Sequence, residues 1–266
     1  MSEAAVLSDV ADGVMTITLN RPDAANAVRP EDRNTLIALL EAADTEEKVR
    51  VVVLRANGKH FCSGADVGAL ADRRALGEKR VLEPTRRIMN GAQKLVAAVL
   101  DCNKPVIAAV HGAATGLGAH LVYASDLVIA TQNAYFAESF VKRGLVVDGG
   151  GCYLLPRRIG MQKAKELAFF GEKLSATEAL TLGLVNRVVD ADEFDATVAD
   201  FAMRLAEAAT SAIAFTKRLL NDSPDTDRSG AFVAEAMAQE IQSYAQDSKE
   251  GVQAFMEKRP TKFTGW

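Results

Sequence analysis

Apolar and polar residues follow two rhythms along the chain, one typical of strands and one of helices. Residues 14–19 alternate apolar and polar side chains just after a turn signal at residues 11–13, so residues 5–20 are expected to form a β-hairpin. Residues 49–55 are rich in β-branched side chains, which predicts a central strand, and residues 105–110 form a short apolar run long enough for a buried strand. These patterns predict a sheet with a central, fully covered part.

Helical patterns lie between and after these strands. Beyond Asp192 the pattern is almost entirely helical, with a polar break at residues 222–228. We therefore expect an α/β protein with a core of repeated ββα units over residues 1–195 and a helical C-terminal region over residues 196–266. Five helical segments are expected within the core. The first begins at Pro30, the second covers residues 71–100 with a break at Pro84, and the next two cover residues 119–124 and 161–170. The fifth begins at Ser175, where Glu178 completes a capping box.

Composition narrows the class of protein. The 266 residues are 48% hydrophobic, enough for a full core, and the net charge of −4 without a basic patch argues against nucleic-acid binding. The three cysteines, Cys62, Cys102 and Cys152, are widely spaced, which argues against a disulfide framework or a zinc site. With no signal-peptide layout and no apolar run of membrane-spanning length, we expect a cytoplasmic protein that binds no membrane.

Residues 109–130 combine an apolar run, three glycines and a second apolar run. Gly112, Gly116 and Gly118 fall where a strand gives way to a helix. Glycine lets a backbone approach a ligand closely, and a helix that begins there presents free N–H groups. This pattern suits an anion, or an oxygen that becomes anionic during a reaction. The alternative is that these glycines serve only a turn and its packing.

A second glycine cluster occurs later in the chain. Gly149, Gly150 and Gly151 precede an apolar helical segment and follow directly after Asp148. The cluster resembles the first one, with a tight backbone at the start of a helix. An irregular segment at residues 59–68, which follows a predicted strand, is a third candidate for the same ligand site.

Five segments, taken together, resemble the crotonase superfamily, the enoyl-CoA hydratase/isomerase family. The resemblance spans nearly the whole chain. It implies a crotonase-like spiral of ββα units over residues 1–195 and a helical region over residues 196–266 that builds homotrimers or dimers of trimers. The segments are LNRPDAANA (19–27), FCSGADV (61–67), AVHGAATGLGAHLVYASD (109–126), GLVVDGGGCYLLPRRIG (144–160) and EGVQAFMEKRPTKFTG (250–265).

The family's shared chemistry is stabilisation of an acyl-thioester enolate by two backbone N–H groups. By position in this sequence, those donors are the N–H groups of Ala65 and Leu117. Losing one such donor typically costs about 3–4 kcal/mol of transition-state stabilisation. The family usually has glycine where this chain has Leu117. Leucine keeps the N–H, although it narrows the pocket or serves another acyl group, and a purely structural role for Leu117 fits as well.

The acid and base groups depart from the family's hydratases. Those enzymes use two glutamates, and the matching positions here are His120 and Phe140. Phe140 cannot transfer a proton, and hydration commonly needs two proton-transfer groups, so simple hydration is disfavoured. Glu138 would reach the second position only if the alignment slipped by two residues.

Asp148 is the favoured base, because the resemblance places it where some isomerases and a dehalogenase of the superfamily have a working aspartate. A single carboxylate above an enolate suffices for a 1,3-proton shift. The alternative is that Asp148 only caps the helix after Gly151. His120 is expected to assist Asp148, to orient it, or to be a neutral, hydrogen-bonded histidine.

The resemblance also implies a coenzyme A site and no cofactor beyond the thioester substrate itself. No spacing in the sequence suggests a metal site. Basic side chains are expected at the phosphates, with Lys258 reaching across from a neighbouring subunit; solvated surface charges are the alternative. The implied CoA-binding residues are Arg21, Ala25, Ala27, Arg29, Ala65, Asp66, Val67 and Lys258.

The sequence thus predicts an acyl-CoA-processing enzyme that isomerises an enoyl-CoA, with Asp148 as base. Hydration, hydrolysis or ring opening through the same enolate are the alternatives within the family. A non-catalytic acyl-CoA-binding protein is the alternative of another class, since Leu117, His120 and Phe140 all depart from the family's pattern.

Overall fold

The structure, a computed structural model of the chain, describes residues 4–66, 68 and 82–266. Its strands are β1 (Val6–Ala11), β2 (Val14–Leu19), β3 (Val51–Ala56), β4 (Val106–Val110), β5 (Ala113–Thr115), β6 (Leu127–Thr131), β7 (Tyr135–Ala137), β8 (Lys173–Ser175) and β9 (Arg187–Val189).

The helices of the core are α1 (Pro30–Thr45), α3 (Glu83–Ile88), α4 (Lys94–Asp101), α5 (Leu117–Ala124), α6 (Gly151–Ile159), α7 (Met161–Phe170), α8 (Ala176–Thr181) and α9 (Phe194–Ala206). The chain then forms α10 (Thr210–Asp222), α11 (Arg228–Ser243) and α12 (Gln246–Glu257). Short helical turns are η1 (Pro22–Ala24), the π-helical η2 (Met89–Gln93), η3 (Val141–Arg143) and η4 (Ser223–Asp225).

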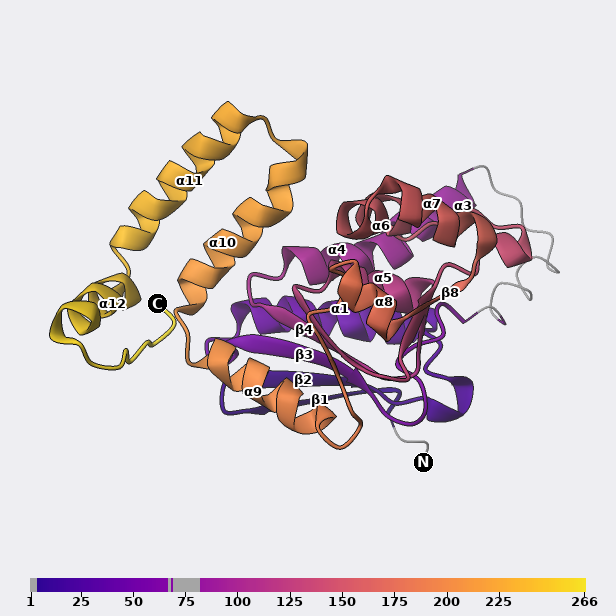
Figure 1. Cartoon of the computed structure of the whole chain (residues 1–266), viewed down its shortest axis with the longest axis horizontal. Helices are drawn as coiled ribbons and strands as arrows, with labels where there is room; N and C mark the ends of the chain where they lie inside the picture. Colours follow the sequence, from indigo (N-terminus) through magenta and orange to yellow (C-terminus); the bar gives the residue numbers. More distant parts are fainter. Residues whose placement is uncertain (1–3, 67, 69–81) are drawn as a thin grey trace.

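Two sheets organise the core. The larger has the order β1-β2-β3-β4-β6-β9, in which β1 and β2 are antiparallel and every later pair is parallel. The smaller sheet has the order β5-β7-β8. Strands β4 and β6 enter the large sheet while β5 and β7, the next strand after each, enter the small one. The chain therefore winds as a spiral of strand–strand units with helices between them, as the sequence predicts (Figure 1).

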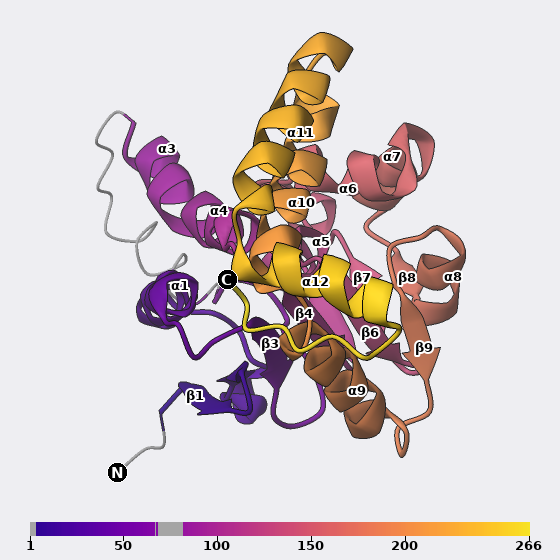
Figure 2. The same cartoon turned by 90° about the vertical axis from the view of Figure 1, so that its left-hand side faces the viewer.

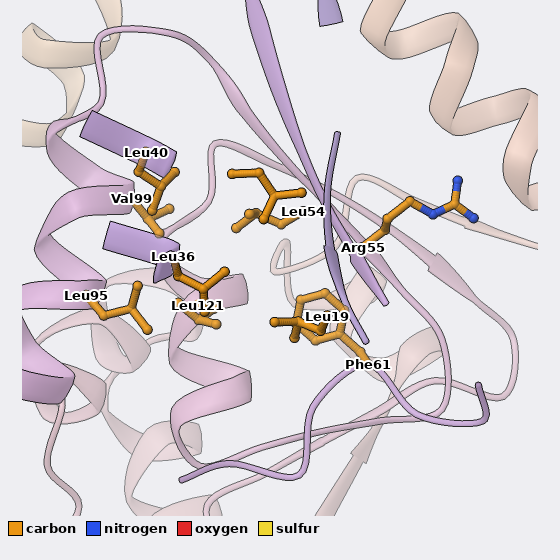
Figure 3. A pocket seen from close by; sticks show the side chains of 10 residues that line it. Leu19, Leu36, Leu40, Leu54, Arg55, Phe61, Leu95, Val99 and Leu121 are labelled. Carbon is orange, nitrogen blue, oxygen red and sulfur yellow. The ribbon is translucent and has the colours of Figure 1, made fainter. Parts of the chain in front are cut away.

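Helices cover both faces of the large sheet. On one face, Leu36 and Leu40 of α1, Leu95 of α4 and Leu121 of α5 converge on apolar side chains of the strands, such as Leu54 (Figure 3). The cavity left between them is only about 10 Å³, so the packing there is close to complete. On the other face, α9 buries its apolar stripe against β3, β4 and β6.

The local expectations are mostly confirmed. The hairpin, the helix from Pro30 and the reciprocal Ser175–Glu178 capping box are all present. Leu82 has a left-handed backbone (φ 69°) and Pro84 lies in the first turn of α3, so the helical path starts here, next to the break expected at Pro84. The rest of the helix expected upstream of it falls largely on residues 69–81, outside the described residues.

The C-terminal helices α10, α11 and α12 project from the core (Figures 1 and 2). The expected boundary at residue 195 falls inside α9, which packs on the large sheet and so belongs to the core. Lys217 of α10 anchors the projecting part, because its Nζ lies 2.8 Å from Oδ2 of Asp126 in the core. Within the described part of the chain, no helix has the length and apolar character needed to cross a membrane.

Candidate active site

A cavity of about 450 Å³ opens where the loops after β2, β3 and β5 meet the turn before α6. Three of the segments singled out in the sequence meet at this cavity with the Asp148 turn. Its lining residues are Ala24, Ala27, Val28, Pro30, Arg33, Ser63, Gly64, Ala65, Asp66, Arg87, Ile88, Ala92, Thr115, Gly116, Leu117, Ser139, Phe140, Arg143, Leu145 and Asp148.

The first wall of the cavity consists of two loops, one containing Val28 and the other Ala65, which are hydrogen-bonded to each other as two parallel strands are. Val28 forms a parallel bridge with Ala65, in which the Val28 N–H donates to the Gly64 carbonyl (2.8 Å) and the Asp66 N–H donates to the Val28 carbonyl (3.0 Å). The N–H of Ala65 therefore points away from this bridge, on the side of the cavity. Asn26, which is buried, fixes the loop by donating to the carbonyl of His60 (2.7 Å).

The second wall is the start of α5. Gly116 has φ 52° and ψ −123°, a conformation that is essentially restricted to glycine, and its own N–H donates to Ala137. Leu117 is the first residue of the helix, so its N–H has no partner within the helix. A Cβ on Gly118 would lie 2.4 Å from the Cys62 carbonyl oxygen, so only glycine allows this helix to lie so close to the first loop.

The two candidate donors are brought together by these contacts. A Cβ on Gly64 would lie 3.7 Å from the backbone nitrogen of Leu117, and Ala65 is the next residue. Neither the Ala65 N–H nor the Leu117 N–H donates a hydrogen bond within the described residues. Two N–H groups without acceptors, that of Ala65 in the loop and that of Leu117 at the start of α5, form an arrangement that can hold a negatively charged oxygen.

Asp148 lines the cavity and is half-buried. Burial raises the pKa of its carboxyl; the nearby His120 lowers that pKa, and Glu138 raises it further. The N-cap of α6 is Gly150, without any side-chain capping bond, so the purely capping role considered for Asp148 is wrong. A carboxylate with a raised pKa at an open cavity is suited to taking up and returning a proton.

His120 and Glu138 both lie behind the cavity. Each side chain is 0% exposed, and His120 Nε2 is 3.1 Å from Glu138 Oε2. Neither residue lines the cavity, whereas Phe140 does. The Phe140 ring lies parallel to the His120 imidazole, with 5.7 Å between ring centroids and 2° between planes. The position that is a glutamate in the family's hydratases is therefore an apolar wall here.

The three basic residues expected at coenzyme A, Arg21, Arg29 and Lys258, are not among the residues that line this cavity. Arg21 donates to the carbonyl of Ala27 (2.7 Å) and pairs with Asp66 (3.2 Å), so it ties the two loops of the first wall together. Arg29 pairs with Asp32 at 2.7 Å. Lys258 ends α12 and does not line this cavity.

The other CoA contacts expected from the sequence are largely at the cavity. Ala27, Ala65 and Asp66 line it, Ala25 accepts a hydrogen bond from the Ser63 N–H, and Val67 lies outside the described residues.

Three other arginines line the cavity and were not singled out in the sequence: Arg33 of α1, Arg87 of α3 and Arg143 of η3. Arg33 and Arg87 lie in charged stretches that resemble a solvated surface, and Arg143 belongs to a Lys-Arg pair between apolar residues, so the sequence pattern alone did not mark them. Among the described residues, no group of three or more His, Cys, Asp or Glu side chains is arranged to hold a metal ion.

Residues 9–265 match the family model of enoyl-CoA hydratase/isomerase. The chain belongs to this family. It is 38% identical over 265 residues to the "Probable enoyl-CoA hydratase" of Rhodobacter capsulatus, with both chains covered completely, and 35% identical over 260 residues to the 1,2-epoxyphenylacetyl-CoA isomerase of Escherichia coli, with 98% of each covered.

The fold agrees with this assignment. The crystal structure of an enoyl-CoA hydratase/isomerase from Cupriavidus metallidurans superposes with a TM-score of 0.92 at 33% identity, covering 100% of this chain and 98% of the other. The spiral of ββα units is thus the crotonase fold, and the protein is an enzyme of the enoyl-CoA hydratase/isomerase type. The names of the relatives include both hydratases and isomerases.

Proposed function

We propose that this enzyme isomerises an enoyl-CoA by moving its double bond, with Asp148 as the base that removes and returns the proton. The observation that carries the proposal is the pairing of two unspent N–H groups with a single available carboxylate at one cavity. Of the two carboxylates among the described lining residues, Asp66 is ion-paired with Arg21, whereas Asp148 has no ion pair.

In this mechanism the thioester carbonyl oxygen accepts hydrogen bonds from the N–H groups of Ala65 and Leu117. Asp148 removes a proton from the carbon next to the carbonyl or from its vinylogous position, and the electron pair moves onto the oxygen. The two N–H groups hold this enolate, and Asp148 returns the same proton to the other carbon. The substrate begins and ends with the same atoms, so no water, cofactor or redox partner is consumed.

Hydration is the less well supported alternative. It needs a positioned water and proton delivery, but Phe140 has no proton to give and His120 is fully buried behind it. A non-catalytic acyl-CoA-binding protein is a further alternative, because the Leu117 side chain stands where the family usually has glycine.

The decisive experiment measures conversion of 3-enoyl-CoA to 2-enoyl-CoA and hydration of 2-enoyl-CoA side by side, in the wild type and in Asp148→Asn. We expect isomerisation to exceed hydration, and Asp148→Asn to lower the isomerisation kcat by about 10²–10⁴-fold. Equal rates in the two proteins would remove Asp148 as the base. Acyl-CoA binding without turnover would favour the binding-protein alternative.

The proposal includes a homotrimer, or a dimer of trimers, built through the helical C-terminal region. The support is a set of large apolar side chains on α11 and α12 that one chain leaves exposed and that a second copy of the chain would cover. Lys258, next to this set, would then reach a neighbour's coenzyme A. Sedimentation analysis tests the assembly, and a cytoplasmic location remains part of the prediction. The exposed set is Phe232, Val233, Met237, Ile241, Tyr244, Val252, Phe255 and Met256.

A further inference from the structure

Two ionisable side chains that the proposed mechanism does not use, His120 and Glu138, are buried against each other. His120 comes from α5 and Glu138 follows β7, so the contact joins two separate ββα units. Burying a lone carboxylate is very costly, and the imidazole 3.1 Å away is the group that offsets that cost. Within the described residues, Nδ1 of His120 and Oε1 of Glu138 have no hydrogen-bond partner, so the pair is not fully satisfied by the scaffold.

The imidazole lies directly beneath the turn that carries Asp148. A Cβ on Gly149 would be 3.1 Å from Nδ1 of His120, and a Cβ on Gly151 would be 2.4 Å from Nε2. The second distance is shorter than real Cβ atoms make, so only glycine allows the turn to rest on the ring. The glycines therefore make room for His120, and the ring in turn sets how deep the Asp148 turn can lie.

The other side of the imidazole supports Phe140, whose ring lines the cavity. The ring is parallel to Phe140, and a Cβ on Gly116 would lie 3.5 Å from Cε2 of Phe140. One buried ring is thus in contact, directly or through Phe140, with both the turn of the proposed base and the loop of a proposed N–H donor. A structural histidine elsewhere in the core would have neither relationship.

We propose that the His120–Glu138 pair is a positioning element of the active site, which supports the Asp148 turn from below. The pair also acts electrostatically on the Asp148 carboxylate. The inference rests on the proposed function of Asp148 as base. The electrostatic effect has a definite sign: burial raises the pKa of Asp148, His120 lowers it, and the weaker effect of Glu138 raises it. Further titratable or charged groups nearby are Tyr123 of α5, which interacts with Glu138, and Cys152 of α6, which interacts with both Glu138 and Asp148. Asp66, Arg33, Arg87 and Arg143 line the same cavity as Asp148.

The test is a direct titration of the Asp148 carboxyl carbon by ¹³C NMR in the full-length protein, assigned by its loss in Asp148→Asn. In His120→Gln we expect the pKa of Asp148 to rise, because the neighbouring imidazole that lowers this pKa has been removed. The acid limb of kcat/KM for isomerisation should move to higher pH by the same amount. An Asp148 pKa that stays at the wild-type value in folded His120→Gln would overturn the inference.

Two further variants separate positioning from mere stability. His120→Gln removes the imidazole from the buried Glu138 and leaves Tyr123 beside it. The double variant with Glu138→Gln is therefore expected to fold better, and it should show a smaller rise in the Asp148 pKa. Leu121→Ala removes a buried side chain of the same helix that packs with Leu36, Leu54 and Leu95 in the core (Figure 3). It should lower stability while leaving the Asp148 titration unchanged. An equal shift in Leu121→Ala would reduce the pair to a packing role.

The failures of the two proposals differ. A wild type that isomerises no enoyl-CoA, but whose Asp148 titration shifts in His120→Gln, refutes the proposed function and leaves the pair's effect on this carboxylate standing. An active isomerase whose acid limb and Asp148 titration are the same in all variants keeps its function and loses the inference.

Discussion

Gly118 of α5 lies against Cys62 of the first loop so closely that a Cβ at residue 118 would be 2.4 Å from the Cys62 carbonyl oxygen and 2.6 Å from its Cβ. This contact sets the spacing of the two walls that carry the Ala65 and Leu117 N–H groups. The geometry on which the proposed chemistry depends is therefore fixed by the absence of one methyl group, in a helix whose every residue is buried.

The Leu117 N–H can be removed while the helix is kept. Proline is well tolerated at the first position of a helix, so Leu117→Pro deletes the donor at little cost to α5. We expect a fall in isomerisation kcat of about 10²–10³-fold. Leu117→Ala is the matched control, because it loses the same buried side chain and retains the N–H. Equal activities of the two variants would show that this N–H does not hold the oxygen.

Asp148 should lower stability at neutral pH, as expected for a working base in a half-buried place. Its folded pKa is raised above 3.8, so the folded state binds the proton more tightly than the unfolded state does. Stability therefore falls as pH rises through the folded pKa, and the loss persists at neutral pH. Asp148→Asn should have a higher melting temperature than the wild type at pH 7, and the gain should shrink toward about pH 4. A lower melting temperature at pH 7 would contradict this.

Gly151 and His120 should be energetically coupled. Gly151 has a helical backbone that alanine can adopt, so destabilisation in Gly151→Ala reports steric clashes of the new Cβ. The shorter clash is with Nε2 of His120 (2.4 Å), and the other is with Cγ1 of Val147 (2.7 Å). We expect a loss of about 1–3 kcal/mol in the free energy of unfolding. With His120→Ala in the background the loss should shrink, giving a coupling of at least about 0.5 kcal/mol in a double-mutant cycle followed by urea denaturation. Additive effects would argue against the contact.

Asp247 of α12 should hold the C-terminal segment against that helix. It is buried, and its carboxylate accepts hydrogen bonds from the N–H groups of Thr264 and Gly265, both at 2.7 Å. Asp247→Ala leaves these donors without partners, so we expect a loss of about 2–3 kcal/mol in the free energy of unfolding. Asp247→Asn keeps one acceptor oxygen and should lose less. Urea denaturation in which both variants match the wild type would refute this role.

Much of the fold could be predicted from the sequence, because many of its elements are determined by residues that are close together in the chain. The hairpin, the helix from Pro30 and the capping box at Ser175 depend on residues only a few positions apart. The small sheet was not predicted, because β5, β7 and β8 have three residues each and pair only through contacts between distant segments.

The candidate site divides in the same way. The two glycine loops and Asp148 were found because each stands in a contiguous segment that matches the family. The pairing of His120 with Glu138 was not predicted, since these residues are 18 positions apart and neither alone signals burial. Arg33 and Arg87 likewise resembled surface charges until the meeting of α1 and α3 placed them at the cavity.

The Cys62 thiol adds a practical consequence. It lies beneath the junction of the two walls, where it accepts a hydrogen bond from the Gly64 N–H, and burial raises its pKa to about 12. A thiol so protonated and enclosed reacts with an alkylating reagent only in the rare moments when the walls separate. The rate at which Cys62 is alkylated would therefore report how often the two walls of the cavity separate, and a bound thioester should lower that rate.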